Sequence, residues 1–281
     1  MTAVDRPAPV PETLARGLDF AAARDAAQPL GSRVLFFPVA SSTNDLAARL
    51  AAQGTADGTL VVAGQQTAGR GRGGHSWFSP PSAGVYFSVV LEQRDGFAHD
   101  WVQALTLATG VAMAEGLHAA SGLPVLIKWP NDLVMAPAGS VRGSRKLAGI
   151  LAEAHSDGGA LAHVVVGVGV NVGAAAWPAE ISSRVTSLDE ELGRQVDPAL
   201  VFGHSLARMG TWIRRLRAGE AGAVRARWQQ LAVGASGATV QIARLDGPRR
   251  GITCGIDAAG ALLVRCGAET DRVTAGEITW L

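Results

Sequence analysis

The chain has 281 residues and a formal net charge of +1 at pH 7, and 48% of its residues are hydrophobic. This composition excludes bulk disorder, and the length suits one large domain or a medium domain with a small appendage. The balanced charge argues against a protein whose main function is to bind duplex nucleic acid, because such binding needs a strongly basic surface.

The sequence carries no signal for export or for membrane insertion. Its two cysteines are too few for a disulfide framework, and its N-terminus lacks the apolar core of a signal peptide. The uncharged stretch between Asp157 and Glu180 is long enough to span a bilayer, but its polar residues, proline and glycines favour a strand and a turn. We therefore expect a cytoplasmic protein that does not contact a membrane.

The first half of the chain predicts strands and helices that follow a flexible tail. Residues 1–30 hold four prolines and much alanine, which indicates a flexible N-terminal tail with one weak helix at about 12–27. Strands are expected at 34–38, 59–64 and 84–92. Ser42 should cap a helix that runs to about residue 52, and Asp100 should cap a long buried helix from Trp101 to about Ala120.

The second half predicts consecutive strands, one long helix and a β-rich end. Strands are expected at 124–128, 133–136, 146–154 and 160–172, and Asp197 and Pro198 begin an amphipathic helix. This order favours an α+β fold with a mixed, mainly antiparallel sheet. From residue 234, short alternating runs between glycine turns predict a small β-barrel. We expect a main domain at 31–233 and a small domain at 234–281.

Lysine and asparagine are scarce in this chain and occur in a few distinct motifs. Only two of the 25 basic residues are lysines, and there are three asparagines. Lys128 begins Lys-Trp-Pro-Asn-Asp, and Lys146 begins Lys-Leu-Ala-Gly-Ile-Leu. Asn44 ends the triplet Ser-Thr-Asn at a helix N-terminus, and Asn171 ends Gly-Val-Gly-Val-Asn. A codon bias, a structural turn and an edge-strand lysine are alternative explanations, but the convergence of these residues favours a site.

The densest motif is the glycine- and arginine-rich stretch 65–77. Its exposed backbone amides and two arginines, Arg70 and Arg72, predict an anion-binding loop, and a mobile surface loop is the alternative. Its glycines also match the dinucleotide-binding pattern, but Ser-Pro-Pro at 79–81 forbids the helix which that pattern requires.

The sequence contains no metal-ligand spacing among its histidines and cysteines and no nucleophile elbow. The predicted site is therefore electrostatic, with arginine and lysine around a phosphate-bearing substrate. This chemistry is typical of phosphoryl or adenylyl transfer, in which positioning and charge neutralisation supply most of the catalysis.

The motifs Ser-Thr-Asn, Gln-Thr-Ala-Gly-Arg-Gly-Arg, Lys-Trp-Pro-Asn-Asp, Lys-Leu-Ala-Gly-Ile-Leu and Gly-Val-Gly-Val-Asn, in this order, closely resemble those of the biotin protein ligases. The resemblance covers about residues 34–281. It implies a catalytic domain related to class II aminoacyl-tRNA synthetases and lipoate ligases, followed by an SH3-like barrel. It also implies a monofunctional enzyme without the DNA-binding domain of the repressor-ligases, so no DNA partner is expected, and a homodimer is left open.

The reaction implied by the resemblance has two steps. The carboxylate of biotin attacks the α-phosphorus of ATP in the presence of Mg²⁺, which gives biotinyl-5′-AMP and pyrophosphate. A lysine of a biotin carboxyl carrier protein domain of an acyl-CoA carboxylase then attacks the mixed anhydride and releases AMP.

The resemblance also implies roles for the residues at matching positions. Biotin would be bound by Ser42, Thr43, Asn44, Gln66, Arg70, Gly71, Arg72 and Lys146. ATP would be bound by Arg72, Trp77, Lys128, Asp132 and Asn171, with Asp132 also a magnesium ligand. The catalytic residues would be Lys146, between the biotin carboxylate and the α-phosphate, and Arg72, which orders the loop over the intermediate.

One departure and two rival functions follow from the same motifs. Many members carry further basic residues where this chain has Gly73-Gly74-His75, which predicts a less charged and more mobile loop. A lipoate- or octanoate-transferring enzyme of the same superfamily has no need for a ureido-binding Ser-Thr-Asn and glutamine. A non-catalytic biotin sensor has no need for Lys146.

Overall fold

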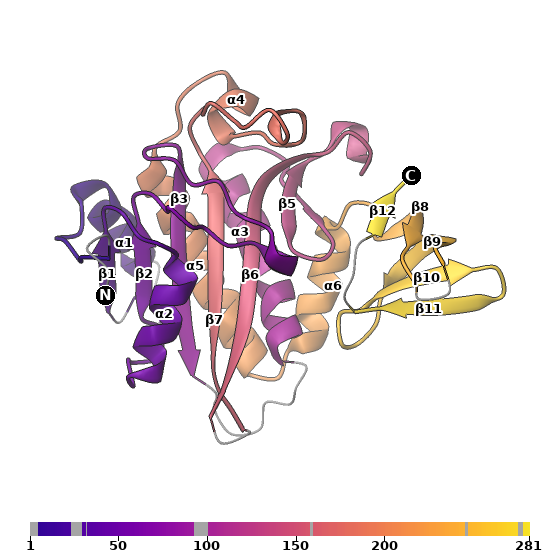
Figure 1. Cartoon of the computed structure of the whole chain (residues 1–281), viewed down its shortest axis with the longest axis horizontal. Helices are drawn as coiled ribbons and strands as arrows, with labels where there is room; N and C mark the ends of the chain where they lie inside the picture. The colour runs from indigo at the N-terminus through magenta and orange to yellow at the C-terminus, as the bar shows by residue number, and fades with distance from the viewer. Residues whose placement is uncertain are drawn as a thin grey trace.

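The computed structural model of the chain describes residues 5–23, 30–31, 33–92, 101–157, 160–244, 247–274 and 278–281. A seven-stranded sheet in the order β1-β2-β3-β7-β6-β5-β4 forms the centre of the larger part (Figure 1). Its strands are β1 (Val34–Phe37), β2 (Leu60–Ala63), β3 (Gly84–Glu92), β4 (Leu126–Lys128), β5 (Asp132–Met135), β6 (Arg145–Asp157) and β7 (Ala160–Asn171). Only β1 and β2 pair in parallel among the described strands, so the predicted mixed, mainly antiparallel sheet is confirmed.

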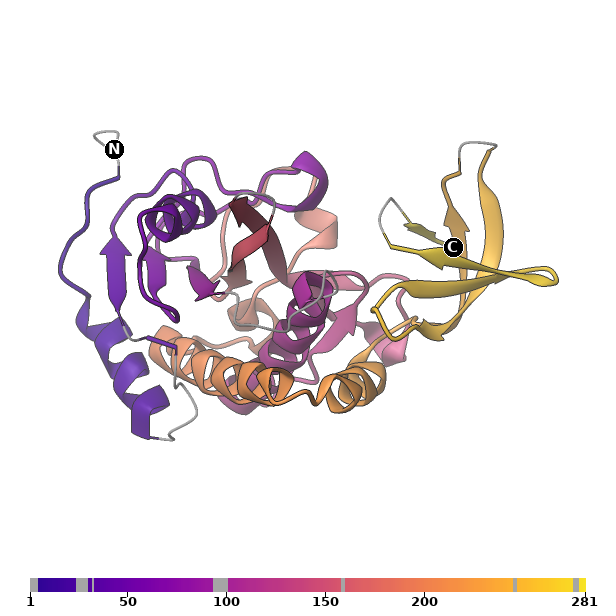
Figure 2. The same ribbon diagram turned by 90° about the horizontal axis from the view of Figure 1, so that it is seen from below.

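The helices cover the two faces of this sheet unequally. The long helices α3 (Trp101–Ser121), α5 (Pro198–Arg217) and α6 (Ala221–Leu231) lie on one face, and α2 (Thr43–Ala52) lies on the other (Figure 2). Side chains alternate between the faces along each strand. Leu60 and Val62 therefore pack in the core with α3, whereas Val61 and Val90 pack with α2. The part of the second face that α2 leaves open is available for a site.

Two expected helix starts are confirmed by their capping bonds. The Ser42 hydroxyl accepts a hydrogen bond from the backbone N–H of Asp45 at 3.4 Å, and α2 begins at the next residue. The Asp197 carboxylate accepts from the backbone N–H of Ala199 at 2.9 Å, before the proline that opens α5. The predicted cap at Asp100 lies outside the described residues. None of the described helices combines the length and apolarity needed to cross a membrane.

Among the described residues, α4 and α6 are two α-helices that the sequence did not predict. Helix α4 (Leu188–Leu192) begins with a capping box in which Ser187 and Glu190 bond to each other's backbone N–H groups. Helix α6 buries only Val224 and Trp228, so its apolar spacing is too sparse to give a helical period.

The C-terminal part is a separate antiparallel sheet. Its order is β11-β10-β9-β8-β12, and its strands are β8 (Ser236–Ile242), β9 (Arg249–Ile256), β10 (Leu262–Cys266), β11 (Glu269–Val273) and β12 (Ile278–Trp280). The predicted β-rich end is confirmed. Closure into a barrel is not, because β12 has three residues and pairs with β8, and β11 pairs with β10 alone among the described strands.

The N-terminal segment packs closely against the main sheet and helices. Helix α1 (Glu12–Ala23) crosses α5 where Gly17 meets Gly203. A Cβ at Gly17 would lie 2.8 Å from the carbonyl oxygen of Ala199. Ala8 forms a bridge with Phe36 of β1. Residues 5–23 are therefore packed, which corrects the flexible tail expected over 1–30 for this stretch. The part of the predicted helix beyond Ala23 lies outside the described residues.

Asp5 is the most buried charge of this segment. Its side chain is 1% exposed, and its carboxylate accepts hydrogen bonds from the backbone N–H of Ser41 at 2.9 Å and from the Ser41 hydroxyl at 3.1 Å. Arg49 forms an ion pair with the same carboxylate at 3.1 Å. Because Ser41 precedes the N-cap of α2, this carboxylate fixes the start of that helix.

We predict that Asp5→Ala lowers the free energy of unfolding by about 1.5–3 kcal/mol, because it removes the charge-assisted hydrogen bonds between a buried carboxylate and Ser41. Urea unfolding followed by circular dichroism measures the change. Asp19→Ala, at an exposed position on α1, is the control and should have almost no effect. Equal stability of the two variants would contradict the prediction.

Candidate active site

A cavity of about 700 Å³ lies on the open part of the sheet face that carries α2. It is bounded by the start of α2, the loop at 65–77, the β4–β5 turn, the middle of β6 and β7, and β12 of the C-terminal sheet. The predicted site residues that line it are Ser42, Thr43, Asn44, Gln66, Arg70, Gly71, Arg72, Trp77, Lys128, Asp132 and Lys146. Segments more than 100 residues apart in the sequence therefore meet around one cavity.

Hydroxyl and amide groups form one end of the cavity, at the start of α2. Gln66 Oε1 accepts from the backbone N–H of Thr43 at 2.8 Å, and Gln66 Nε2 donates to the Ser79 hydroxyl at 2.8 Å. The Ser88 hydroxyl on β3 lies 2.6 Å from Asn44 Oδ1 and 2.8 Å from Thr43 Oγ1. The positions of these groups are set by hydrogen bonds, as recognition of a polar ligand requires.

Glycines in β6 and β7 make room for the side chains that stand on the sheet. A Cβ at Gly167 would lie 2.0 Å from Asn44 Oδ1, and a Cβ at Gly169 would lie 2.4 Å from Trp77 Nε1. Gly149 of β6 lies against the same indole ring, with a Cβ-to-ring distance of 3.0 Å. Any larger residue would displace the amide or the indole, so these glycines set the depth of the cavity floor.

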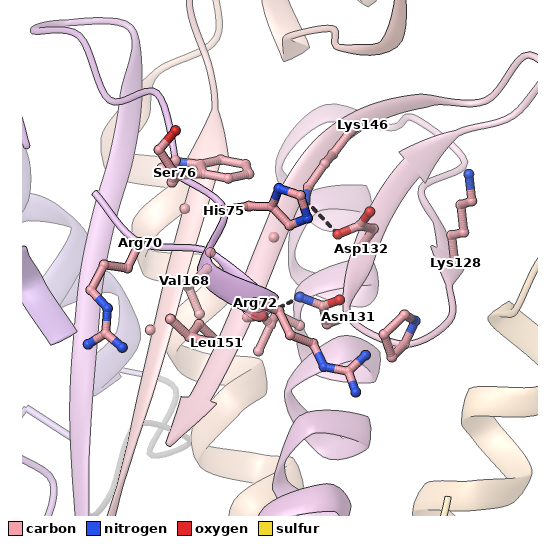
Figure 3. Close-up of a pocket in the computed structure, with 18 of the residues that line it drawn as sticks. Arg70, Arg72, His75, Ser76, Lys128, Asn131, Asp132, Lys146, Leu151 and Val168 are labelled. Atoms are coloured by element: carbon pink, nitrogen blue, oxygen red, sulfur yellow. Dashed lines mark hydrogen bonds and ion pairs between the residues drawn. The ribbon is translucent and has the colours of Figure 1, made fainter. Parts of the chain in front are cut away.

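The loop at 65–77 is held by backbone bonds at its base and by Arg70. Trp77 N–H donates to the carbonyl of Gly69 at 2.8 Å, and Ala68 N–H donates to the carbonyl of Ser41 at 2.8 Å. The Arg70 guanidinium forms ion pairs with Asp45 of α2 and Glu153 of β6. The hydrogen bond to Asp45 contributes most to raising the pKa of Arg70. In Figure 3, Arg70 lies apart from the other cations of the cavity.

The other end of the cavity holds three cations around one carboxylate. Lys146 Nζ lies 2.7 Å from Asp132 Oδ1 (Figure 3). The same Nζ lies 5.1 Å from the centre of the Trp77 ring. Burial lowers the pKa of the Lys128 ammonium, and repulsion from Lys146 adds to this while Asp132 opposes it. Burial also lowers the pKa of the Arg72 guanidinium, which Asp132 partly offsets. Positive charge is therefore concentrated where it is poorly hydrated, which favours binding of an anion.

Arg72 and Lys128 also connect the cavity to the C-terminal sheet. Arg72 Nη2 donates to the carbonyl of Thr274 at 3.2 Å, and its guanidinium lies 5.9 Å from the centre of the Trp129 ring. Lys128 Nζ lies 5.9 Å from the centre of the Trp280 ring, and Trp280 lines the cavity. No motif of the sequence predicted a site residue in the C-terminal part.

The structure places Asn171 outside the cavity lining. Its side chain is 3% exposed and donates to the backbone carbonyls of Thr186 at 2.9 Å and of Lys146 at 3.5 Å. It thus supports the strand that carries Lys146, and its role toward a nucleotide stays a prediction.

Ser88 and Glu153 are polar site residues that the sequence analysis missed. Ser88 lies between Phe87 and Val89 in β3, and Glu153 lies between two alanines in β6, on the same face as Gly149 and Leu151 because it is separated from them by even numbers of residues. That alternation was the signal that could have identified them.

Asp132 is the sole carboxylate among the described residues that line the cavity. Across the described part of the chain, no group of three or more His, Cys, Asp or Glu side chains could hold a metal ion. A divalent cation at this site would therefore depend on oxygen ligands from a substrate as well as on Asp132.

Comparison with known proteins identifies the family of this chain. Residues 36–171 match the model of the biotin/lipoate A/B protein ligase family, and residues 235–279 match that of the biotin protein ligase C-terminal domain. A biotin–[acetyl-CoA-carboxylase] ligase of Paracoccus denitrificans is 32% identical over 243 residues, which are 84% of this chain and 96% of that protein. The chain belongs to the biotin protein ligase family.

Other similar proteins agree with this assignment. The bifunctional ligase/repressor BirA of Bacillus subtilis is 31% identical over 89% of this chain and 74% of its own length. The structure of a biotin protein ligase from Aquifex aeolicus in complex with biotin and ATP has a TM-score of 0.74 and 26% identity, and the match covers 89% of this chain and 99% of that one. The likeness thus extends over both sheets.

We predict that Lys128→Met raises the midpoint of urea unfolding, because the lowered pKa means that the folded state binds this proton more weakly than the unfolded chain does. The advantage of the variant should shrink as the pH rises toward 10.5, where the unfolded lysine also loses its charge. Arg142→Met, at an exposed position, is the control. A lower midpoint for Lys128→Met than for the wild type would refute the prediction.

Proposed function

We propose that this chain binds biotin and ATP side by side in the cavity, forms biotinyl-5′-AMP, and transfers biotin to a lysine of a biotin carboxyl carrier domain. The observation that carries the proposal is that one cavity joins a hydrogen-bonding end at Asn44 to a cationic end at Lys146. Family membership supports the reaction class.

The polar end suits the ureido ring of biotin. A cyclic urea offers two N–H donors and one carbonyl acceptor. Asn44 Oδ1 and the hydroxyls of Ser42 and Thr43 can accept from the N–H groups, and the Gln66 amide retains an N–H for the carbonyl. Gly71, which also lines the cavity, lets the loop approach the ring closely.

The cationic end suits the joining of two negative groups. The biotin carboxylate oxygen attacks the α-phosphorus, a new P–O bond forms, and the bond to the pyrophosphate oxygen breaks with its electron pair leaving on pyrophosphate. Lys146 lies where it can offset the repulsion between the carboxylate and the phosphate, and Lys128 and Arg72 can bind the phosphates. The Trp77 ring provides a flat surface for the adenine.

Magnesium fits this site only together with ATP. Mg²⁺ is commonly held by one or two carboxylates plus substrate phosphates, and Asp132 can supply one such carboxylate. The ion would neutralise phosphate charge, while Asp132 also holds Lys146 in place through the ion pair at 2.7 Å.

In the second step the acceptor lysine amine attacks the carbonyl carbon of the anhydride. A C–N bond forms, the C–O bond to AMP breaks, and the amine loses a proton to solvent. The acceptor domain is the partner that this step requires. We add no DNA-binding role, because the net charge of +1 provides no general basic surface, and a homodimer and a cytoplasmic location stay predictions.

Exchange of labelled pyrophosphate into ATP, with biotin or lipoate as the carboxylic acid, tests this proposal. We expect exchange with biotin only. Exchange with lipoate instead would favour the lipoate-transferring alternative, and no exchange despite biotin binding would favour the sensor.

We predict that Lys146→Ala reduces biotin-dependent pyrophosphate exchange by about 10³-fold, because a cation at 4 Å contributes about 4 kcal/mol at an effective dielectric constant near 20. Arg145→Ala is the matched control, since this neighbouring exposed side chain pairs with Glu191. Circular dichroism should show an unchanged fold in both. Exchange within a few-fold of the wild type would exclude a catalytic role for Lys146.

We predict that Arg72→Gly still forms the adenylate but releases it early, because the loop loses its bond to Thr274 and its contact with Trp129. Mass spectrometry of a lysine-rich bystander protein should then detect biotin on many lysines. Strict modification of the acceptor domain alone would show that Arg72 does not retain the intermediate.

A further inference from the structure

Glu153 lies beyond the polar end of the cavity and joins two parts of it. Its side chain is 24% exposed, and its Oε2 accepts from Asn44 Nδ2 at 2.9 Å. Its other oxygen pairs with the guanidinium of Arg70. One carboxylate therefore contacts both the amide that lies on the cavity floor and the loop that covers the cavity.

The contacts of Asn44 fix which way its amide points. Asn44 Nδ2 lies 3.2 Å from the carbonyl oxygen of Leu151 and 2.9 Å from Glu153 Oε2. Both of these oxygens can only accept, so the nitrogen must face them and both of its N–H groups are used. Asn44 Oδ1 consequently faces Ser88 and has one lone pair left, so Asn44 can offer a ligand an acceptor and no donor.

The contacts of Arg70 direct it away from the phosphate-binding end. Its two ion pairs join the loop to Asp45 on α2 and to Glu153 on β6. Figure 3 places Arg70 well apart from Arg72, Lys146 and Asp132. The guanidinium thus holds the loop over the polar end through two ion pairs, and Glu153 is the partner in one of them.

We propose that Glu153 is a positioning residue for the ureido ring of biotin, which it serves by orienting Asn44 as an acceptor and by anchoring Arg70 over the ring. This inference rests on the proposed function. Neither contact involves the cationic end, where Lys146 and Asp132 lie. Loss of the carboxylate should therefore weaken the binding of biotin and leave the use of ATP unchanged.

Steady-state kinetics of Glu153→Gln test the proposal. The amide keeps the shape of the carboxylate, but it removes the charge and lets a nitrogen face Asn44 or Arg70. We expect the KM for biotin to rise about tenfold to a hundredfold, since two charge-assisted bonds are weakened, while kcat and the KM for ATP change less than about threefold. Glu269→Gln, at an exposed carboxylate of the C-terminal sheet, is the control.

Binding of desthiobiotin tests whether the variant affects the ureido ring in particular or the whole site. Desthiobiotin keeps the cyclic urea and lacks the sulfur ring, so Glu153→Gln should weaken biotin and desthiobiotin by the same factor. An unchanged KM for biotin, or equal changes in the KM for biotin and the KM for ATP, would overturn the proposal. A wild-type chain that fails to bind biotin at all would instead overturn the proposed function.

Arg70→Gln is a second variant. It removes the ion pairs of Arg70 with Asp45 and Glu153 and leaves Asn44 hydrogen-bonded to Glu153. Because Glu153 also orients Asn44, Glu153→Gln should cost more biotin affinity than Arg70→Gln, measured by isothermal titration calorimetry with biotin alone. An equal or smaller loss in Glu153→Gln would overturn the proposed orientation of Asn44. Glu153→Asp, which keeps the charge, should recover part of the lost affinity.

Discussion

The crowding of positive charge around one carboxylate is the constraint on which the rest of this site depends. Lys146, Lys128 and Arg72 come from separate segments, and burial lowers the pKa of Lys128 and of Arg72. Asp132 offsets only part of this charge. The sheet, the loop and the C-terminal strands hold these side chains where water hydrates them poorly. A negatively charged substrate that binds there neutralises the excess positive charge.

The two ends of the cavity are built by different physical means. The cationic end relies on charge, whereas the polar end relies on hydrogen-bond direction, which is set by acceptors such as Leu151 O and Glu153 and by the hydroxyl of Ser88. Glycines at 149, 167 and 169 let both sets of side chains lie directly on the sheet. A ligand that spans the cavity must therefore carry hydrogen-bonding groups at one end and an anion at the other.

The sequence predicted the strands of the main sheet, the helix caps at Ser42 and Asp197 and the gathering of the two lysines, because these features are local or follow from unusual residue types. It did not predict α6, whose apolar spacing is sparse, or Glu153 and Trp280, whose proximity to the cavity depends on strand pairing and on the position of the C-terminal sheet. Asn171 stood out by its rarity, yet its amide supports the backbone at Lys146. Scarcity thus indicated importance without indicating the direction of a side chain.

The two ends of the described chain both lie close to functional parts, and this affects how the protein can be handled in the laboratory. Asp5 fastens the residue before the cap of α2, and Trp280 lines the cavity one position before Leu281, whose backbone N–H donates to Thr239 at 3.0 Å. A purification tag placed next to Asp5 or Leu281 would start within a few residues of these contacts. A long flexible spacer, or a tag inserted in an exposed loop, would preserve native behaviour better than a short terminal fusion.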